Sequence, residues 1–188
     1  MILYPTETLY ALGVNAFDEK ALSRLYALKE RDASKASSWL VRSVEDIERY
    51  AVVGDKAAKI AQRFLPGKLT LVLKALPTLP KELIAQDGTI AFRISGDSLA
   101  QKTVAEFMEA HDAPLTCTSA NVSGLATLGT AGEILQQFGP KANLITKIVD
   151  GGPRKGLAST IVRVIGNEVT ILREGDISEA EIWKVLEL

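Results

Sequence analysis

The chain has 188 residues, of which 47% are hydrophobic and 24% charged, with a formal net charge of −1. These values are ordinary for a globular protein, and they provide no global positive field that would attract nucleic acid or an acidic membrane. The single cysteine excludes an intramolecular disulfide. No apolar stretch approaches the roughly 18–20 residues of a membrane helix. We therefore expect one globular domain over residues 1–188, located in the cytoplasm.

The first half of the chain alternates predicted strands and helices. A strand over 1–4 ends at Pro5, and a helix capped by Asp18 continues to Leu28 because its apolar residues recur at helical spacing. A polar loop follows over 32–38. The other elements expected here are a strand over 39–41, a brief helix with a Ser43–Asp46 capping box, a helix opened by Asp55 and running through Phe64, and strands over 69–73 and 89–94.

The second half continues the mixture. The pattern predicts a helix from Asp97 to His111, a strand over 115–118, a helix with a Thr130–Glu133 capping box, a strand over 144–149, a hairpin of strands 160–165 and 169–173, and a last helix capped by Ser178 and Glu181. Because strands and helices are not segregated into halves, the sequence predicts an α/β or α+β fold with a mainly mixed sheet.

Several catalytic schemes are excluded by what the sequence lacks. It contains neither a P-loop motif nor a Gly-x-Ser-x-Gly elbow. One histidine and one cysteine cannot build a zinc cage, and we expect His111 on the surface. What remains is a set of hydroxyls, one amide and several cations at the edges of apolar runs: 5–10, 29–31, 118–124, 159–162 and 172–175. Such groups bind anions, so they favour phosphoryl or nucleotidyl transfer.

These clusters, in this order, resemble the YrdC/TsaC family. The matching motifs are Pro-Thr-Glu-Thr-x-Tyr-x-Leu-Gly, Lys-x-Arg, Pro-Gly-x-Leu-Thr, Ala-x-Arg, Ser-Ala-Asn-x-Ser-Gly, Ser-Thr-Ile-Val and Arg-x-Gly. The resemblance implies a twisted, mixed, open sheet flanked by helices, with a concave active-site cleft. It also implies an L-threonylcarbamoyladenylate synthase, which makes threonylcarbamoyl-AMP and pyrophosphate from L-threonine, bicarbonate or CO2, and ATP for modification of adenosine 37 of tRNA.

The resemblance assigns roles position by position. It implies a catalytic quartet formed by Lys29, Arg31, Ser119 and Asn121. It implies L-threonine contacts from Thr8, Arg93, Cys117 and Ser159, although Cys117 by itself indicates a small buried hydrophobe. It implies ATP contacts from Arg31, Lys35, Thr89, Ser119, Thr127 and Arg173. The charges of Lys29, Arg31, Lys35 and Arg173 match the roughly four negative charges of ATP. Arginine suits phosphate or carboxylate better than lysine does, because its guanidinium can donate two parallel hydrogen bonds.

The implied reaction needs positioning more than a protein nucleophile. The threonine amine takes up CO2, and the resulting carbamate attacks the α-phosphorus of ATP in line. Mg²⁺ accompanies ATP and keeps several waters, so we expect no dedicated protein metal site, with Glu7 as a candidate partner. The resemblance also implies tRNA and the tRNA threonylcarbamoyl-transfer proteins as partners. Lys29→Ala and Arg31→Ala are predicted to abolish turnover while leaving thermal unfolding nearly unchanged.

Other interpretations stay open at this point. A YciO-like paralogue would bind RNA or nucleotide without this synthesis, and the residues between Asp32 and Ser38 depart from the family pattern. A carbamoyl-transfer module like that of hydrogenase maturation proteins is a third interpretation. Locally, Lys29 and Arg31 are also typical of a helix C-terminus, and Ser119 of a strand-end turn. The glycine-rich segment 151–156 indicates an exposed turn more than a phosphate cradle.

Overall fold

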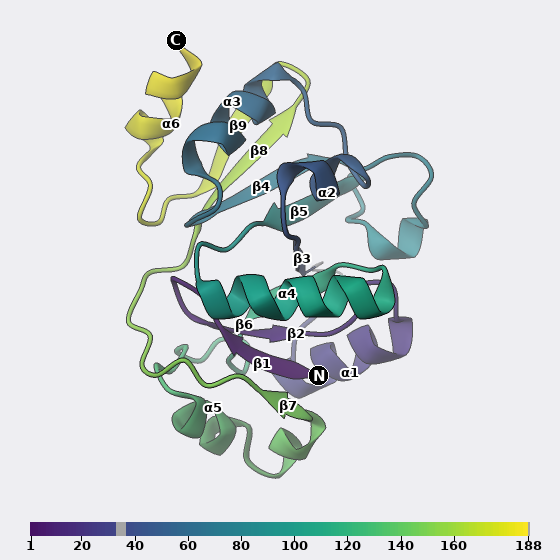
Figure 1. Ribbon diagram of the computed structural model, residues 1–188, viewed down its shortest axis with the longest axis vertical. Helices are drawn as coiled ribbons and strands as arrows, with labels where there is room; N and C mark the ends of the chain where they lie inside the picture. Colours follow the sequence, from purple (N-terminus) through teal and green to yellow (C-terminus); the bar gives the residue numbers. More distant parts are fainter. Residues whose placement is uncertain (33–36, 188) are drawn as a thin grey trace.

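The computed structural model describes residues 1–32 and 37–187. Within them, nine strands form one mixed sheet in the order β7-β1-β2-β6-β3-β5-β4-β8-β9 (Figure 1). The strands are β1 Ile2–Pro5, β2 Tyr10–Gly13, β3 Ser38–Leu40, β4 Leu69–Lys74, β5 Thr89–Arg93, β6 Leu115–Ser119, β7 Lys147–Ile148, β8 Thr160–Ile165 and β9 Glu168–Arg173. The helices are α1 Glu19–Lys29, α2 Val44–Glu48, α3 Asp55–Phe64, α4 Ser98–His111, α5 Ala131–Phe138 and α6 Glu179–Leu186, with 3₁₀ turns η1 Lys81–Leu83 and η2 Gly139–Leu144.

Helices cover both faces of the β1–β2 end of the sheet. Alternate strand residues point to opposite faces, and here Leu3 and Tyr4 enter two different apolar clusters. Leu3 packs with buried residues of α1 and α5, whereas Tyr4 belongs to the cluster that contains α4 residues such as Val104. Figure 1 shows α4 crossing in front of β1, β2 and β6. This end of the sheet is therefore held rigidly between two helical layers.

The other end of the sheet carries α2, α3 and α6. The residues Ile47, Ile60 and Ile182 of these helices are fully buried in the same cluster as Leu71 of β4 and Val162 of β8. In Figure 1, α3 and α6 lie next to β8 and β9, at the end of the molecule where the C-terminus lies. The two halves of the sheet meet where β6 pairs with both β2 and β3.

Most predicted elements are present, and the capping signals are the most accurate. The Asp18 carboxylate accepts from Ala21 N at 3.0 Å, and Thr130 with Glu133 forms a complete capping box. Ser43 caps α2, but the Asp46 carboxylate bonds Arg42 instead of closing a box. The mixed α/β fold class predicted from the sequence is confirmed.

Three local predictions are wrong at their edges, and one strand was missed. Pro5 belongs to the first strand and pairs with Tyr10. Proline lacks the N–H that the sheet would use, but at the last position of a strand this costs little. The strand β2 was not predicted from the sequence. Gly54, not Asp55, is the N-cap of α3. The strand expected over 144–149 is reduced to Lys147–Ile148, since the chain before it forms η2.

None of the helices in the described part of the chain is long and apolar enough to cross a membrane. The predicted cytoplasmic location stays a prediction.

Candidate functional site

The hairpin turn between β1 and β2 places two threonine hydroxyls in the protein interior. Thr6 Oγ1 donates to Leu9 O at 2.6 Å and accepts from the amides of Thr8 and Leu9 at 3.2 Å. Thr8 Oγ1 lies 2.9 Å from Thr6 Oγ1. Because the single hydroxyl proton of Thr6 is donated to Leu9 O, Thr8 is the donor of this bond. Both residues are buried. The sequence Thr-Glu-Thr therefore folds on itself as a rigid hydroxyl-bearing turn.

Arg93, at the end of β5, contacts this turn. Its Nη1 donates to Thr8 Oγ1 at 3.2 Å, and its Nη2 forms an ion pair with Glu7 Oε1 at 2.6 Å. The other carboxylate oxygen of Glu7 accepts from Ser95 Oγ. Burial would lower the pKa of Arg93, but Cys117 and Glu7 outweigh it and hold the pKa above its usual value. Because both oxygens of Glu7 are engaged here, the structure gives Glu7 the role of orienting Arg93.

Lys29 ends α1 beneath the loop that follows β6. Its Nζ donates to the carbonyl oxygens of Ser119 and, at 2.8 Å, Asn121. The side chain is only 2% exposed, and burial lowers its pKa to about 8, with a further contribution from the charge of Arg31. Glu30 follows in the left-handed region with φ 52°, which turns the chain so that Arg31 leaves the helix axis.

Ser119 and Asn121 form the polar end of this loop. Ser119 Oγ donates to Asn121 Oδ1 at 2.6 Å, and Asn121 Nδ2 donates to the carbonyls of Val122 and Leu125. Arg31 Nη1 reaches the neighbouring Thr118 Oγ1 at 3.1 Å. These hydrogen bonds fix the Asn121 amide, and Ser119 beside it is exposed at the surface of the loop.

Ser159 and Arg173 close the opposite side. The Arg173 guanidinium donates through Nε and Nη2 to Ser159 O at 3.0 and 2.7 Å. Ser159 Oγ lies 2.7 Å from Thr70 Oγ1 of β4. Burial, together with repulsion from Arg93, lowers the pKa of Arg173. The β8–β9 hairpin therefore presents a cation at the same place as β5.

These groups surround two adjoining hollows. The central hollow has a volume of about 370 Å³. It is bordered by Thr6, Thr8, Leu9, Tyr10, Ala11, Arg31, Ser38, Thr70, Ala91, Arg93, Cys117, Thr118, Ser119, Thr127, Ala158, Ser159, Ile161 and Arg173. The outer hollow, about 460 Å³, is bordered by Lys29, Glu30, Arg31, Asp32, Ser119, Asn121, Ser123 and Gly124. Because Arg31 and Ser119 border both, the two hollows adjoin each other and together form the candidate site.

Ten of the twelve residues singled out from the sequence border this site. The implied quartet lies together around the outer hollow. The four residues for which the resemblance implies a contact with L-threonine border the central hollow, as do Thr127 and Arg173. Thr89 borders neither hollow, and its hydroxyl donates to Asp87 Oδ1 at 2.6 Å. Lys35 lies outside the described residues. The ligand role of each residue stays a prediction.

Some bordering residues were not singled out from the sequence. Ser38 Oγ donates to Cys117 O at 2.5 Å, and both residues face the central hollow, while their neighbours Trp39 and Thr116 do not border it. Thr70 and Thr118 supply two further hydroxyls. For Thr70, a hydroxyl between the apolar residues Leu69 and Leu71 is a signal that could have been used. The partner strands could not be inferred from the sequence.

Three cations of the site are partly withdrawn from water. Burial lowers the pKa of Lys29, Arg31 and Arg173, which means that the protein by itself stabilises these cations less well than water does. Glu7 forms an ion pair with Arg93. An anionic ligand would offset the cost of burying the three cations, so the site is suited to phosphate and carboxylate groups.

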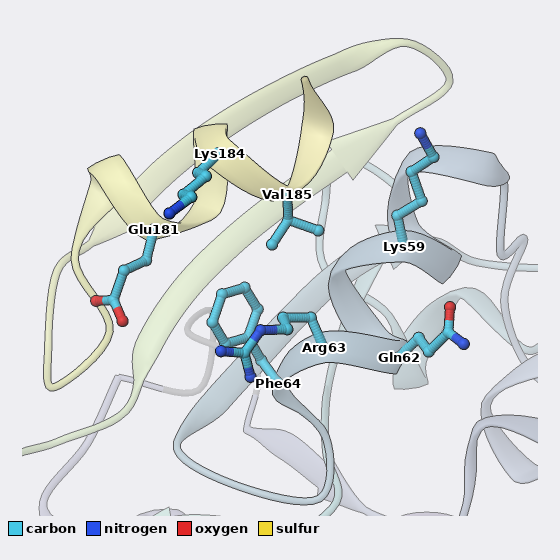
Figure 2. Close-up of a pocket in the computed structure, with 7 residues that line it drawn as sticks. All are labelled: Lys59, Gln62, Arg63, Phe64, Glu181, Lys184 and Val185. Atoms are coloured by element: carbon cyan, nitrogen blue, oxygen red, sulfur yellow. The ribbon is translucent and has the colours of Figure 1, made fainter. Parts of the chain in front are cut away.

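A different and larger hollow lies away from this site. The α3–α6 groove, about 520 Å³, is bordered by Lys59, Gln62, Arg63, Phe64, Glu181, Lys184 and Val185 (Figure 2). Figure 2 shows side chains of the two helices facing each other across it. It contains none of the residues singled out from the sequence, and its charged residues are exposed. Volume alone therefore does not identify the functional site.

Fold and site together define a mixed α/β protein whose hydroxyl- and cation-lined hollow suits an anionic ligand. The Sua5/YciO/YrdC family, described as telomere recombination, matches residues 1–175. The chain belongs to this family. A putative threonylcarbamoyl-AMP synthase of Methanocaldococcus jannaschii is 36% identical over 175 residues, covering 93% of this chain and 79% of that protein.

Two further comparisons involve Pyrococcus abyssi. Its threonylcarbamoyl-AMP synthase is 34% identical over 188 residues, covering 99% of this chain and 53% of that protein. The crystal structure of P. abyssi Sua5 complexed with L-threonine superposes with a TM-score of 0.86 at 33% identity, covering 98% of this chain and 53% of that one. The chain thus spans about half the length of these P. abyssi proteins.

Proposed function

We propose that this protein is an L-threonylcarbamoyladenylate synthase, a nucleotidyltransferase that joins L-threonine, bicarbonate or CO2, and the AMP part of ATP. The observation that carries the proposal is that the two hollows adjoin, because Arg31 and Ser119 border both. The central hollow is bordered by several hydroxyls and three arginines, and the outer one by two cations, two carboxylates, two serine hydroxyls and the Asn121 amide. Relatives named threonylcarbamoyl-AMP synthase support the same reaction.

L-Threonine is the proposed occupant of the central hollow. Arg93 would bind its carboxylate, since a guanidinium held by Glu7 presents a fixed fork. Thr8, Ser159 and Thr70 would surround the amino acid with hydroxyls, while Ala91 and Ile161 supply apolar wall. The relative crystallised with L-threonine supports this half of the proposal.

ATP is the proposed occupant of the outer hollow and of the adjoining part of the central hollow bordered by Thr127 and Arg173, with its α-phosphate next to Ser119. Lys29 and Arg31 would offset the phosphate charge from one side and Arg173 from the other. The carbamate formed on the threonine nitrogen would attack the α-phosphorus, and pyrophosphate would leave toward solvent. Catalysis then consists of alignment and charge stabilisation, in which these chain residues hold both reactants in place.

Mg²⁺ would enter as part of its complex with ATP. Within the described residues, no group of three or more histidine, cysteine or carboxylate side chains could hold a metal ion. Phosphate oxygens and waters would therefore supply most ligands, as Mg²⁺ prefers. Downstream, tRNA and the proteins that transfer the threonylcarbamoyl group are proposed as partners.

The test is turnover that needs all three substrates. The protein would be incubated with ATP, labelled bicarbonate and L-threonine, and pyrophosphate release measured together with transfer of label to a nucleotide product. Release that depends on both threonine and bicarbonate supports the synthase. Binding of RNA or nucleotide without such turnover would favour the YciO-like alternative.

A further inference from the structure

The connection between β7 and β8 crosses the threonine turn as a strap, defined here as residues 150–158. Gly156 N donates to Thr8 O at 3.1 Å, and a Cβ on Gly156 would lie 2.6 Å from that oxygen. At the other end of the strap, Tyr10 Oη donates to Asp150 Oδ1 at 2.9 Å. The amides of Gly151, Gly152, Arg154 and Gly156 all donate to protein atoms. The strap is thus a fixed cover and not a phosphate cradle.

Arg154 is the side chain that fastens the strap to the turn. Its Nε donates to Thr6 O at 2.9 Å, its Nη1 to Gly151 O at 2.7 Å, and its Nη2 to Asp97 Oδ2 at 2.8 Å. The side chains of Arg154 and Asp97 are only 18% and 15% exposed. An ion pair withdrawn from solvent in this way fixes geometry more firmly than an exposed pair does.

Asp97 extends this contact toward the site. Its Oδ1 caps α4 by accepting from Leu99 N and Ala100 N, while its own backbone amide donates to Ser95 Oγ at 3.2 Å. Ser95 in turn holds Glu7, which pairs with Arg93. The hydrogen bonds close into a ring whose members, in order, are Arg154, Asp97, Ser95, Glu7, Arg93, Thr8 and Thr6.

We propose that Arg154 and Asp97 are positioning residues for the amino-acid half of the site. Neither borders the central hollow, so neither touches the substrate. They act through the ring, which fixes the fork of Arg93 and the hydroxyl of Thr8 relative to each other. The inference rests on the proposed function, because it takes L-threonine as the ligand of Arg93. Small displacements of a binding group cost affinity out of proportion to their size.

A purely structural role for Arg154 makes a different prediction. If the arginine only held the strap in place, its loss would lower stability and affect both substrates alike. If it positions Arg93 and Thr8, its loss weakens L-threonine binding and leaves nucleotide binding nearly intact, because Lys29, Arg31 and Ser119 lie outside the ring. The ratio of the two affinities is therefore the decisive quantity.

The experiment is calorimetric titration of the full chain with L-threonine and, separately, with a non-hydrolysable ATP analogue. Arg154→Ala is expected to raise the dissociation constant of L-threonine by about tenfold or more and that of the ATP analogue by less than about threefold. Asp97→Ser should give the same pattern, because serine still caps α4 but is too short to reach Arg154. Arg49→Ala is the matched control, since Arg49 pairs with Asp112 at 2.7 Å and neither residue borders the site. Added guanidinium ion should partly restore threonine binding to Arg154→Ala alone.

Equal weakening of both ligands, or unchanged threonine affinity in a folded Arg154→Ala, would overturn the inference. If Arg154→Ala does not fold, Arg154→Lys and Asp97→Ser carry the same comparison. Failure of the unsubstituted protein to bind L-threonine would instead remove the proposed function, and the inference with it.

Discussion

The Nζ of Lys29 donates to the carbonyl oxygen of Asn121 at 2.8 Å and so joins the end of α1 to the loop after β6. The attachment is reciprocal, because Ser123 N donates to Lys29 O at 2.7 Å. Lys29 therefore has two separable functions. It supports the loop that carries Ser119, and it supplies positive charge to the outer hollow.

Lys29→Met is expected to lower the free energy of unfolding by about 2–4 kcal/mol, since two carbonyl oxygens lose their donor and a buried site is repacked. The sequence alone led to the prediction that Lys29→Ala leaves unfolding nearly unchanged, whereas the burial of Lys29 in the structure argues for a loss of stability. Chemical denaturation followed by circular dichroism measures the change. Lys20→Met, at an exposed position of the same helix, is the control and should shift unfolding by less than about 0.5 kcal/mol. An unchanged midpoint for Lys29→Met would contradict the burial of its ammonium.

The affinity for ATP is expected to fall as pH rises above 8. The pKa of Lys29 lies near 8 in the folded protein, and a bound polyphosphate would raise it, so binding takes up a proton above that pH. The dissociation constant for an ATP analogue should then increase by up to about tenfold per pH unit between pH 8 and 9.5. Titration calorimetry at several pH values tests this, and Lys29→Met should flatten the profile.

The same shift has a consequence for stability with a defined sign. The pKa of Lys29 is lower in the folded than in the unfolded chain, so between about 8 and 10.5 the unfolded chain holds a proton that the folded chain has lost. The charge on Lys29 therefore carries a cost below pH 8 that reduces the net contribution of its hydrogen bonds, and this cost disappears as pH rises through that window. The loss of stability caused by Lys29→Met should accordingly grow between about pH 8 and 10.5, whereas a loss independent of pH would argue for an ordinary lysine pKa.

Glu7 and Arg93 are expected to be strongly coupled. Their side chains are 17% and 9% exposed, and removing one partner leaves a charge withdrawn from water. Glu7→Gln should lower the free energy of unfolding by about 2–4 kcal/mol. It should also weaken the binding of L-threonine, because Arg93 loses its orientation. A double-mutant cycle with Arg93→Gln measures the coupling, expected at about 1–3 kcal/mol. Additive effects would show that the pair does not act as a unit.

Local signals in the sequence predicted local structure well, but the pairing of strands distant in the sequence could not be predicted from it. Thr130 with Glu133 predicts a helix start because both halves of the box lie three residues apart. By contrast, β2 was missed because Tyr10–Gly13 is buried throughout and shows no alternation. For the site, the quartet was predicted through the family resemblance. The orienting role of Glu7 depends on Ser95 and Arg93, which reach it only through the fold.

For Thr89, the role implied by the resemblance and the position in the structure disagree. The resemblance implies an ATP contact, but Thr89 is 4% exposed, borders neither hollow and donates its hydroxyl to Asp87. Thr89→Val should therefore leave the dissociation constant of an ATP analogue within about twofold, while losing about 1 kcal/mol of stability with the hydrogen bond. Thr127→Val is the matched comparison, because the resemblance implies an ATP contact from Thr127 too and Thr127 does border the site. Loss of a hydrogen bond to the nucleotide should raise the dissociation constant of the analogue by about fivefold. Equal weakening by both substitutions would place the nucleotide further along β5 than these hollows extend.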